Sequence, residues 1–405
     1  MWRLHVAPTS HALEGFKDRR DVRTWEPFAL PRGVRPPVPP PHPWVGDVLA
    51  AVGWAASWGE MPTLPPVAEH TARRVGLDHA RSTVIIMADG LGTHALGQRL
   101  AHAPTLRRIG TEMVVAQTCS PSTTAAALTT FATGALPAET RMVGYSVRHG
   151  DGVMNLLKFA EDVESLTWQP VPTFFEKFSR QGVGSVVITD PRFRHSGLTS
   201  AAMRGARFVP ATQLSERFEA AIREIRVGTP IIYVYWAGID ATGHHYGPNS
   251  REWAEALEDF DAALGHFLRR AEGNAQVLLT ADHGMVEVEE RVDIAFIPEL
   301  SEDVEVLAGE GRAVHVHIRP GKARETIRRW CRYWEGNAWI AAGREIARVI
   351  GVGPGLELVG DMMVFPKGRT VIVDSRTQSA ASIALKGVHG SLTPEEMEIP
   401  FWRLI

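Results

Sequence analysis

Short apolar runs alternate with longer amphipathic stretches from about residue 82 onward. The apolar runs cover residues 83–88, 113–116, 184–189, 231–236 and 277–280, and the amphipathic stretches cover residues 173–181, 213–225, 251–271 and 322–334. Runs that are apolar at successive positions fit strands buried on both faces, and the amphipathic stretches fit helices. The pattern predicts an α/β fold with a mostly parallel sheet flanked by helices on both faces.

The pattern changes between residues 296 and 386, where candidate strands at 304–307, 314–318 and 371–373 surround two helices. We interpret this range as an inserted α+β cap subdomain. The predicted catalytic domain then comprises residues 76–295 and 387–405, and residues 1–75 form an N-terminal arm. The arm is proline-rich at 31–43. Because proline fixes φ and lacks an N–H, this stretch favours extended structure.

Composition narrows the class of protein. Of the 405 residues, 44% are apolar and 22% are charged, which is typical of a globular chain. A formal net charge of -3 gives no general electrostatic attraction to nucleic acid or to an anionic membrane. The chain has only two cysteines and no apolar signal segment in its first twenty residues, which predicts a cytoplasmic protein. It has no apolar run long enough to span a membrane, so we expect no membrane association.

Three of the predicted strands are followed closely by an aspartate: Asp89, Asp240 and Asp282. In open α/β sheets, ligands bind beyond the carboxyl ends of the strands, so the three carboxylates are expected to converge there. Each aspartate alone also fits a turn former or a helix cap. Three in the same setting, two of them joined to histidines, favour a functional site.

Histidines accompany two of these aspartates. His244 follows Asp240 by four residues, and His283 directly follows Asp282. A further histidine, His389, lies between two glycines in the segment Gly-Val-His-Gly at 387–390. Mixed carboxylate and imidazole ligands suit zinc and similar ions. The pattern therefore predicts a metal site.

The segment 121–134 reads Pro-Ser-Thr-Thr-Ala-Ala-Ala-Leu-Thr-Thr-Phe-Ala-Thr-Gly. Alanine favours a helix, threonine is a good N-cap and Gly134 is a natural stop, so we expect Thr124 at a helix N-terminus. The dipole and free amides there favour an anionic oxygen. Either Thr123 or Thr124 could serve only as the cap. A nucleophilic hydroxyl without an adjacent base needs another activator, such as direct metal coordination.

These residues together resemble the two-zinc site of the alkaline phosphatase superfamily. The set, in chain order, is Asp89, Thr124, Asp240, His244, Asp282, His283 and His389. The segment Asp-Ala-Thr-Gly-His-His-Tyr-Gly-Pro at 240–248 is similar to the Asp-Ser-Ser-Gly-His-x-Tyr-Gly-Pro signature of the nucleotide pyrophosphatase/phosphodiesterases, the type I phosphodiesterase family. The spacing from Thr124 to Gly134 also matches that family, and the similarity spans residues 83–401.

The resemblance implies an alkaline phosphatase-like fold and two divalent ions, which we expect to be Zn²⁺. It assigns one ion to Asp89, Thr124, Asp282 and His283, and the other to Asp240, His244 and His389. In such sites the two ions lie about 3.5 to 4 Å apart and clamp a phosphoryl group. Thr124 is then the expected nucleophile, and hydrolysis is expected to pass through a phosphothreonine intermediate.

The chain also departs from the family pattern. The pyrophosphatases commonly follow the nucleophile with an aromatic residue and Pro-Asn-His, whereas three alanines follow Thr124. Tyr145 stands where an asparagine commonly helps to hold a phosphoryl oxygen, so its hydroxyl is expected to donate that hydrogen bond. The resemblance therefore implies phosphoester chemistry more directly than it implies a nucleotide substrate.

The expected activity is that of a metal-dependent phosphodiesterase or nucleotide pyrophosphatase acting on a small phosphate ester such as a nucleotide. A phosphomonoesterase is one alternative, with Arg141, Arg192 and Arg194 as candidate cations for the extra charge. A sulfatase is another, because Cys119-Ser-Pro-Ser begins like the Cys-x-Pro-x-Arg motif, although Thr123 replaces the arginine. Two further alternatives are a phosphomutase and a non-catalytic binding protein in which the metal ions only stabilise the fold. The sequence predicts no oligomeric state.

Overall fold

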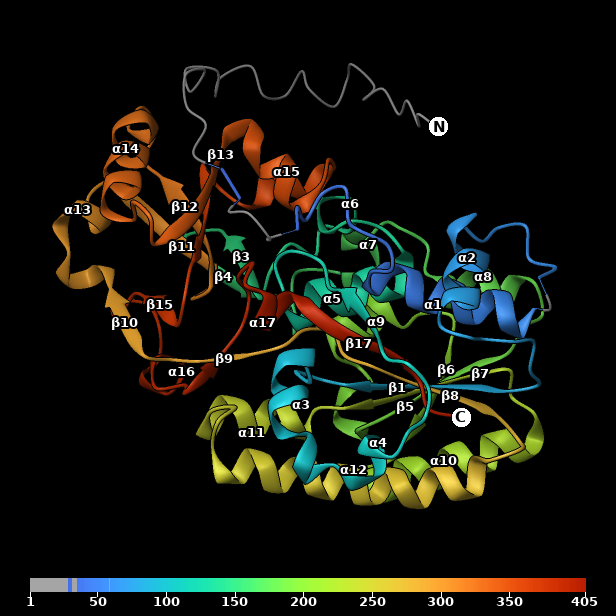
Figure 1. The fold of residues 1–405 in the computed structure, drawn as a ribbon. Helices are drawn as coiled ribbons and strands as arrows, with labels where there is room; N and C mark the ends of the chain where they lie inside the picture. Colours follow the sequence, from blue (N-terminus) through green and yellow to red (C-terminus); the bar gives the residue numbers. More distant parts are fainter. Residues whose placement is uncertain (1–27, 31–34, 58) are drawn as a thin grey trace.

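The computed structural model describes residues 28–30, 35–57 and 59–405 (Figure 1). The segment on which the expected absence of a signal peptide rests, and residues 31–34 of the proline-rich stretch, lie outside the described residues. Within the described part, no helix is long and apolar enough to cross a bilayer.

The main sheet has seven strands in the order β2-β17-β8-β1-β7-β5-β6. They are β1 (Thr83–Ala88), β2 (Val114–Gln117), β5 (Ser185–Thr189), β6 (Arg207–Pro210), β7 (Ile231–Trp236), β8 (Gln276–Thr280) and β17 (Glu398–Arg403). Strand β17 runs antiparallel to β2 and β8, and the other pairs are parallel. All residues of β1, β5 and β8 are buried, as expected for strands covered on both faces.

Helices cover both faces of this sheet (Figure 1). One face carries α3 (Thr93–Arg99), α4 (Pro104–Arg107), α10 (Leu214–Val227), α11 (Gly238–Tyr246) and α12 (Arg251–Ala271). The other carries α1 (Val45–Ala56), α5 (Thr124–Thr133), α8 (Phe174–Arg180) and α9 (Gly197–Ala202). The helix α12 buries Trp253, Leu257, Phe260, Leu264 and Phe267, which recur every three or four residues and so form one apolar stripe. The α/β prediction is confirmed.

A second, four-stranded antiparallel sheet lies between residues 304 and 366, in the order β11-β12-β14-β13. Its strands are β11 (Val304–Glu310), β12 (Ala313–Ile318), β13 (Ala338–Ala342) and β14 (Met362–Pro366), and α13 (Pro298–Ser301), α14 (Ala323–Tyr333) and α15 (Ala347–Ile350) accompany them. Along β12, Val314, Val316 and Ile318 join a separate apolar core, whereas Ala313 joins the core of the main sheet. Because side chains alternate along a strand, the two faces of this sheet pack against two different apolar cores.

Smaller elements complete the fold. Three two-stranded pairs are β3 (Ser146–His149) with β4 (Gly152–Asn155), β9 (Val286–Glu287) with β16 (Gly387–Val388), and β10 (Glu290–Asp293) with β15 (Thr370–Val373). The short helices are α2 (Val67–Arg74), α6 (Pro137–Thr140), α7 (Ser165–Trp168), α16 (Ala380–Ile383) and α17 (Pro394–Met397). The 3-10 turns are η2 (Leu100–His102), η3 (Pro191–Phe193), η4 (Ile294–Phe296), η5 (Gly343–Ile346) and η6 (Pro354–Leu358).

One helix bears on the predicted domain boundaries. The helix α1 falls within the range 1–75 that the sequence assigned to an arm, yet it is almost wholly buried and belongs to the core of the main sheet. It contacts α5, the helix that begins at Thr124. Residues 45–56 therefore pack against α5. The division of the chain into an arm, a catalytic domain and a cap stays a prediction.

Candidate active site

The three aspartates singled out in the sequence meet at one edge of the main sheet. Asp89 directly follows β1, Asp282 follows β8, and Asp240 lies in α11 directly after β7. Because β8, β1 and β7 are neighbouring parallel strands, their carboxyl ends lie side by side. Gly90 permits the close approach: its φ is 71°, and a Cβ there would lie 2.9 Å from Asp240 Oδ1.

Three imidazoles face these carboxylates, and each is held through its Nδ1 atom. The Nδ1 contacts are His244 to the Gly387 carbonyl at 2.7 Å, His283 to the Gly284 carbonyl at 3.0 Å, and His389 to the Ser122 carbonyl at 2.9 Å. A carbonyl oxygen only accepts, so each Nδ1 carries the proton and donates it. The lone pair of each Nε2 is left free for a metal ion, an arrangement that orients histidine ligands in metal sites.

The free ring nitrogens and the carboxylate oxygens form two adjoining groups. In the first, His283 Nε2 lies 3.4 Å from Asp89 Oδ1 and 3.5 Å from Asp282 Oδ2. In the second, His244 Nε2 lies 3.3 Å from Asp240 Oδ2 and 3.3 Å from His389 Nε2. The rings of His283 and His389 stack with centroids 3.6 Å apart, which joins the two groups.

The electrostatics of this cluster fit divalent cations. Asp89 Oδ1, Asp240 Oδ1 and Asp282 Oδ2 are buried and accept no hydrogen bond from any residue that the structure describes. Burial, followed by the charges of Asp282 and Asp240, raises the pKa of Asp89 well above its ordinary value. Burial and the neighbouring imidazoles lower the pKa of His389 well below its ordinary value, so its ring stays neutral. Buried acceptors with no donor and neutral imidazoles are the donor set that zinc and similar ions bind. Among the described residues, ligand atoms lie close enough to hold an ion in two groups, Asp89 with Asp282 and His283, and Asp240 with His283 and His389, so that His283 belongs to both.

Thr124 lies at the edge of the same cluster. It is the first residue of α5, and Thr123 is the N-cap, with φ -140° and ψ 147°. The N-cap position therefore falls on Thr123, whose side chain makes no capping hydrogen bond, and not on Thr124. Thr124 Oγ1 lies 3.2 Å from His283 Nε2, and Gly134 ends the helix in the left-handed conformation. All seven predicted metal ligands thus lie in contact with at least one other member of the set.

Tyr145 differs from these seven residues. Its side chain is 44% exposed, and no hydrogen bond joins its hydroxyl to any residue that the structure describes. Its backbone N–H donates to Glu310 Oε2 at 2.8 Å. The predicted role of the Tyr145 hydroxyl stays a prediction.

The arginines considered for a monoester site are placed against aromatic rings. The guanidinium of Arg141 lies 4.4 Å from the ring centroid of Trp168, and those of Arg192 and Arg194 lie over Phe193 and Phe208. Within the described chain, none of the three hydrogen-bonds to the cluster of metal-ligand candidates. Three other polar residues near the cluster were not predicted from the sequence, Tyr235, Ser122 and Arg312, because their partners are distant along the chain.

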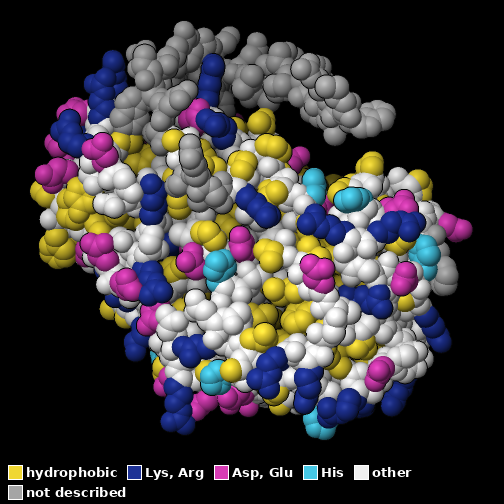
Figure 2. Space-filling model, viewed as in Figure 1, with side chains coloured by type: hydrophobic (Ala, Val, Ile, Leu, Met, Phe, Trp, Pro, Cys, Tyr) yellow, Lys and Arg dark blue, Asp and Glu magenta, His cyan; other side chains and the backbone are white. Residues whose placement is uncertain are grey.

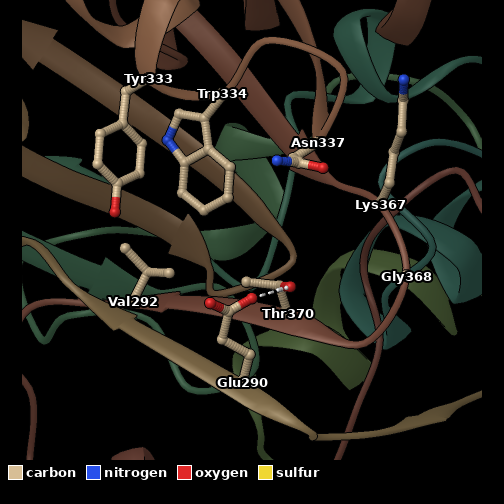
Figure 3. Close-up of a pocket in the computed structure, with 8 residues that line it drawn as sticks. All are labelled: Glu290, Val292, Tyr333, Trp334, Asn337, Lys367, Gly368 and Thr370. Carbon is tan, nitrogen blue, oxygen red and sulfur yellow. Dashed lines mark hydrogen bonds between the residues drawn. The ribbon is translucent and has the colours of Figure 1, made fainter.

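A separate cavity of about 360 Å³ lies among β10, β15 and the end of α14 (Figure 3). Tyr333 and Trp334 form one wall, and Glu290 and Thr370 lie opposite, joined by a 2.8 Å hydrogen bond from the threonine hydroxyl. None of the seven predicted ligands lines it. The chemistry of the aspartates and histidines is therefore located elsewhere, at the edge of the main sheet.

Comparison with known proteins decides the family. The model of the type I phosphodiesterase/nucleotide pyrophosphatase family matches residues 83–392, more than half of the chain. The chain belongs to this family. As a type I phosphodiesterase family member it is a phosphoester hydrolase of the phosphodiesterase/pyrophosphatase type, and the resemblance stated from the sequence is confirmed.

Solved structures similar to this type I phosphodiesterase family member share its fold. Murine ectonucleotide pyrophosphatase/phosphodiesterase 5 is 16% identical with a TM-score of 0.63, and the match covers 79% of this chain and 87% of the murine one. Phosphonoacetate hydrolase from Sinorhizobium meliloti 1021, in complex with phosphonoformate, is 19% identical with a TM-score of 0.62, covering 80% and 90%. These matches confirm the alkaline phosphatase-like architecture.

Proposed function

We propose that this chain is a two-metal phosphodiesterase or nucleotide pyrophosphatase that uses Thr124 as its nucleophile. The observation that supports this most directly is the 3.2 Å distance between Thr124 Oγ1 and His283 Nε2, at the start of α5 and beside the buried carboxylates. A hydroxyl in this position lies beside a metal-ligand candidate and at a helix start, where the first backbone amides have no partner within the helix.

Two divalent cations, which we propose to be Zn²⁺, complete the site. One would be held by Asp89, Thr124, Asp282 and His283, and the other by Asp240, His244 and His389, a division that the contacts within each set support. When bound, such ions stabilise negative charge on phosphoryl and ester oxygens and favour the ionised form of a coordinated hydroxyl. The unpartnered carboxylate oxygens support this proposal, because they otherwise stay buried without compensation.

The residues of the chain carry out two displacements. Thr124 Oγ1 loses its proton to solvent and forms a bond to phosphorus, while the bond from phosphorus to the departing ester oxygen breaks and that oxygen takes a proton. The backbone amides at the start of α5 donate to a non-bridging oxygen of the bound phosphoryl group. Water then attacks the phosphothreonine ester, the bond to Oγ1 breaks, and Thr124 regains a proton.

The substrate is a small phosphoryl compound, and a nucleotide is the class that we propose. An inactive variant of the murine relative was solved in complex with AMP, and the bacterial relative was solved with phosphonoacetate. Both ligands are small and carry a phosphorus-centred anion. A cytoplasmic location is part of the proposal, since Cys119 and Cys331 are both free thiols, which suits a reducing compartment.

Steady-state hydrolysis by the zinc-loaded protein tests this function. Matched aryl esters of a nucleotide, of phosphate and of sulfate should be compared, with Thr124→Ala as the control. We expect the nucleotide diester to be preferred and the control to lose activity by at least about a thousandfold while it retains zinc. A preference for the monoester or the sulfate would favour the alternative hydrolases of the superfamily. Zinc binding without any hydrolysis would favour a non-catalytic binding protein.

A further inference from the structure

The tip of the hairpin between β11 and β12 reaches the loops of the candidate active site. This hairpin tip consists of Glu310, Gly311 and Arg312, and burial raises the pKa of Glu310 to about 8. Its position is fixed, because Ile372 N–H donates to the Gly311 carbonyl at 2.9 Å and a Cβ on Gly311 would lie 2.3 Å from Val371 Cγ2. The hairpin tip therefore has little freedom to move relative to β15.

Arg312 is fully buried and forms a bidentate ion pair with Glu396, which lies in α17. Its Nε lies 3.0 Å from Glu396 Oε1, and its Nη2 lies 2.6 Å from Oε2. Its Nη1 donates to the Thr370 carbonyl at 2.7 Å. Parallel N–H bonds from a guanidinium to a carboxylate fix the relative orientation of the two groups more strictly than a single contact.

Glu396 in turn fixes the loop that carries His389. Its carboxylate accepts from Ser391 N–H at 3.0 Å and from the Thr393 hydroxyl at 2.6 Å, and its backbone carbonyl accepts from Gly284 N–H at 2.9 Å. Ser391 is two residues beyond His389, and Gly284 directly follows His283. One buried carboxylate residue thus supports the loops of two metal-ligand candidates.

Ser122 extends the same network to the nucleophile. Its hydroxyl donates to the Ser391 carbonyl at 2.7 Å and accepts from Gly390 N–H at 3.2 Å, and its carbonyl accepts the Nδ1 proton of His389 at 2.9 Å. Ser122 is two residues before Thr124. The hydrogen bonds therefore run without a gap from Arg312 to the ring of His389 and to the turn before α5.

Glu310 contacts the same loops from the other side of the hairpin tip. Its Oε2 accepts the Tyr145 N–H at 2.8 Å, and a Cβ on Gly390 would lie 2.8 Å from Glu310 Cγ. Glu310 therefore lies against Gly390, and Arg312 reaches Ser391 only through the carboxylate of Glu396.

A buried ion pair contributes little net stability compared with apolar side chains of the same volume, because both charges must lose their hydration. Here the ion pair acts by fixing the orientation of the Glu396 carboxylate. We propose that Arg312 is a positioning residue that, through Glu396, Ser391 and Ser122, aligns His389 and the turn before Thr124 and so sets the affinity of the site for zinc. The proposal rests on the metal site of the proposed function.

Zinc affinity of Arg312→Met, measured by competition with a chromophoric chelator, tests this positioning. We expect affinity to fall about 10- to 100-fold, the usual effect of removing a group that orients a metal ligand. The matched control is Arg204→Met. Arg204 also pairs with a carboxylate, Glu176 at 2.9 Å, and donates to backbone carbonyls, but its contacts lie away from the cluster. The control should lose thermal stability while it keeps the zinc affinity of the wild type.

Ser122→Ala is the second variant, because it removes the middle of the network and leaves the buried ion pair intact. We expect it to fold and to bind zinc more weakly even if Arg312→Met does not fold. Wild-type affinity in Ser122→Ala, or equal losses in Arg312→Met and Arg204→Met, would overturn the proposal. Zinc affinity is measured without turnover, so an inactive wild-type protein that binds zinc would contradict the proposed hydrolysis and leave the Arg312 result interpretable. A wild-type protein that binds no zinc would overturn both.

Discussion

The hydroxyl of Tyr235, near the end of β7, donates a hydrogen bond to Asp89 Oδ2 at the end of the neighbouring strand β1. Burial and the charge of Asp89 raise the pKa of Tyr235 well above its ordinary value, so the hydroxyl keeps its proton. This contact leaves Asp89 Oδ1 as the oxygen that faces His283 Nε2.

Tyr235→Phe should therefore weaken zinc binding about 10- to 100-fold, because the carboxylate of Asp89 loses the group that orients it. Tyr233→Phe is the matched control, since Tyr233 lies on the same strand, is buried, and has a hydroxyl without a hydrogen-bond partner in the described chain. Chelator competition on both variants checks this. Equal affinities in the two variants would show that the contact to Asp89 does not matter for the metal.

Gly90→Ala should weaken zinc binding for a steric reason. The added Cβ would lie 2.9 Å from Asp240 Oδ1 and would separate the carboxylates of Asp240 and Asp89. Gly182→Ala controls for backbone strain alone, because Gly182 has φ 75° and its Cβ would meet no atom within 4 Å. We expect both variants to lose about 1 kcal/mol of unfolding free energy and only Gly90→Ala to lose zinc affinity. Comparable affinities would contradict the steric account.

His315 should make the protein sensitive to acid. Burial, with a smaller effect of His317, lowers the pKa of His315 from its ordinary 6.5 to about 3. Between these two values the unfolded chain binds a proton that the folded chain does not, so the free energy of unfolding falls as the pH drops below about 6.5. His315→Gln should reduce this slope by about 1.4 kcal/mol per pH unit. Urea unfolding of metal-free protein from pH 7 to pH 5 measures the slope, and an unchanged slope in the variant would refute the assignment.

Both cysteines should resist alkylation in the folded protein. Burial raises the pKa of Cys119 and of Cys331 to about 12, so little thiolate forms at pH 8. Iodoacetamide at pH 8 should add no mass to the native protein and two adducts to the urea-unfolded protein. A single adduct after unfolding, with Cys119 converted to an aldehyde, would instead support the sulfatase alternative.

Much of the fold follows from local pattern. The predicted helix at 251–271 coincides with α12, because its apolar residues recur every three or four positions. The predicted strand at 231–236 coincides with β7, because a short run of β-branched and aromatic residues fits a buried strand. Strand β17 was missed: it contains Pro400, which removes a ladder donor, and it runs antiparallel between β2 and β8. The position of β17 in the sheet depends on pairing with β2 and β8, which are distant from it in the sequence.

The candidate site, too, was predictable from the sequence only in part. The metal-ligand candidates were visible in the sequence because aspartates at the ends of parallel strands must share one edge, whatever the loops do. The residues that orient them were not visible. Arg312 lies 84 positions before its partner Glu396, and Ser122 reaches Ser391 across 269 positions, so neither contact leaves a local signal. The family resemblance also assigned Tyr145 a role, and its hydroxyl forms no hydrogen bond with any described residue.

The central claim is that Thr124 becomes covalently bonded to phosphorus during turnover. Acid quenching of the zinc-loaded protein during hydrolysis of an aryl nucleotide ester, followed by peptide mass spectrometry, tests it most directly. We predict that the peptide containing Thr124 carries the nucleotidyl group as a phosphothreonine ester, and that the Thr124→Ala protein carries none. Product release in a burst with Thr124 unmodified, or a label on another residue, would contradict the account.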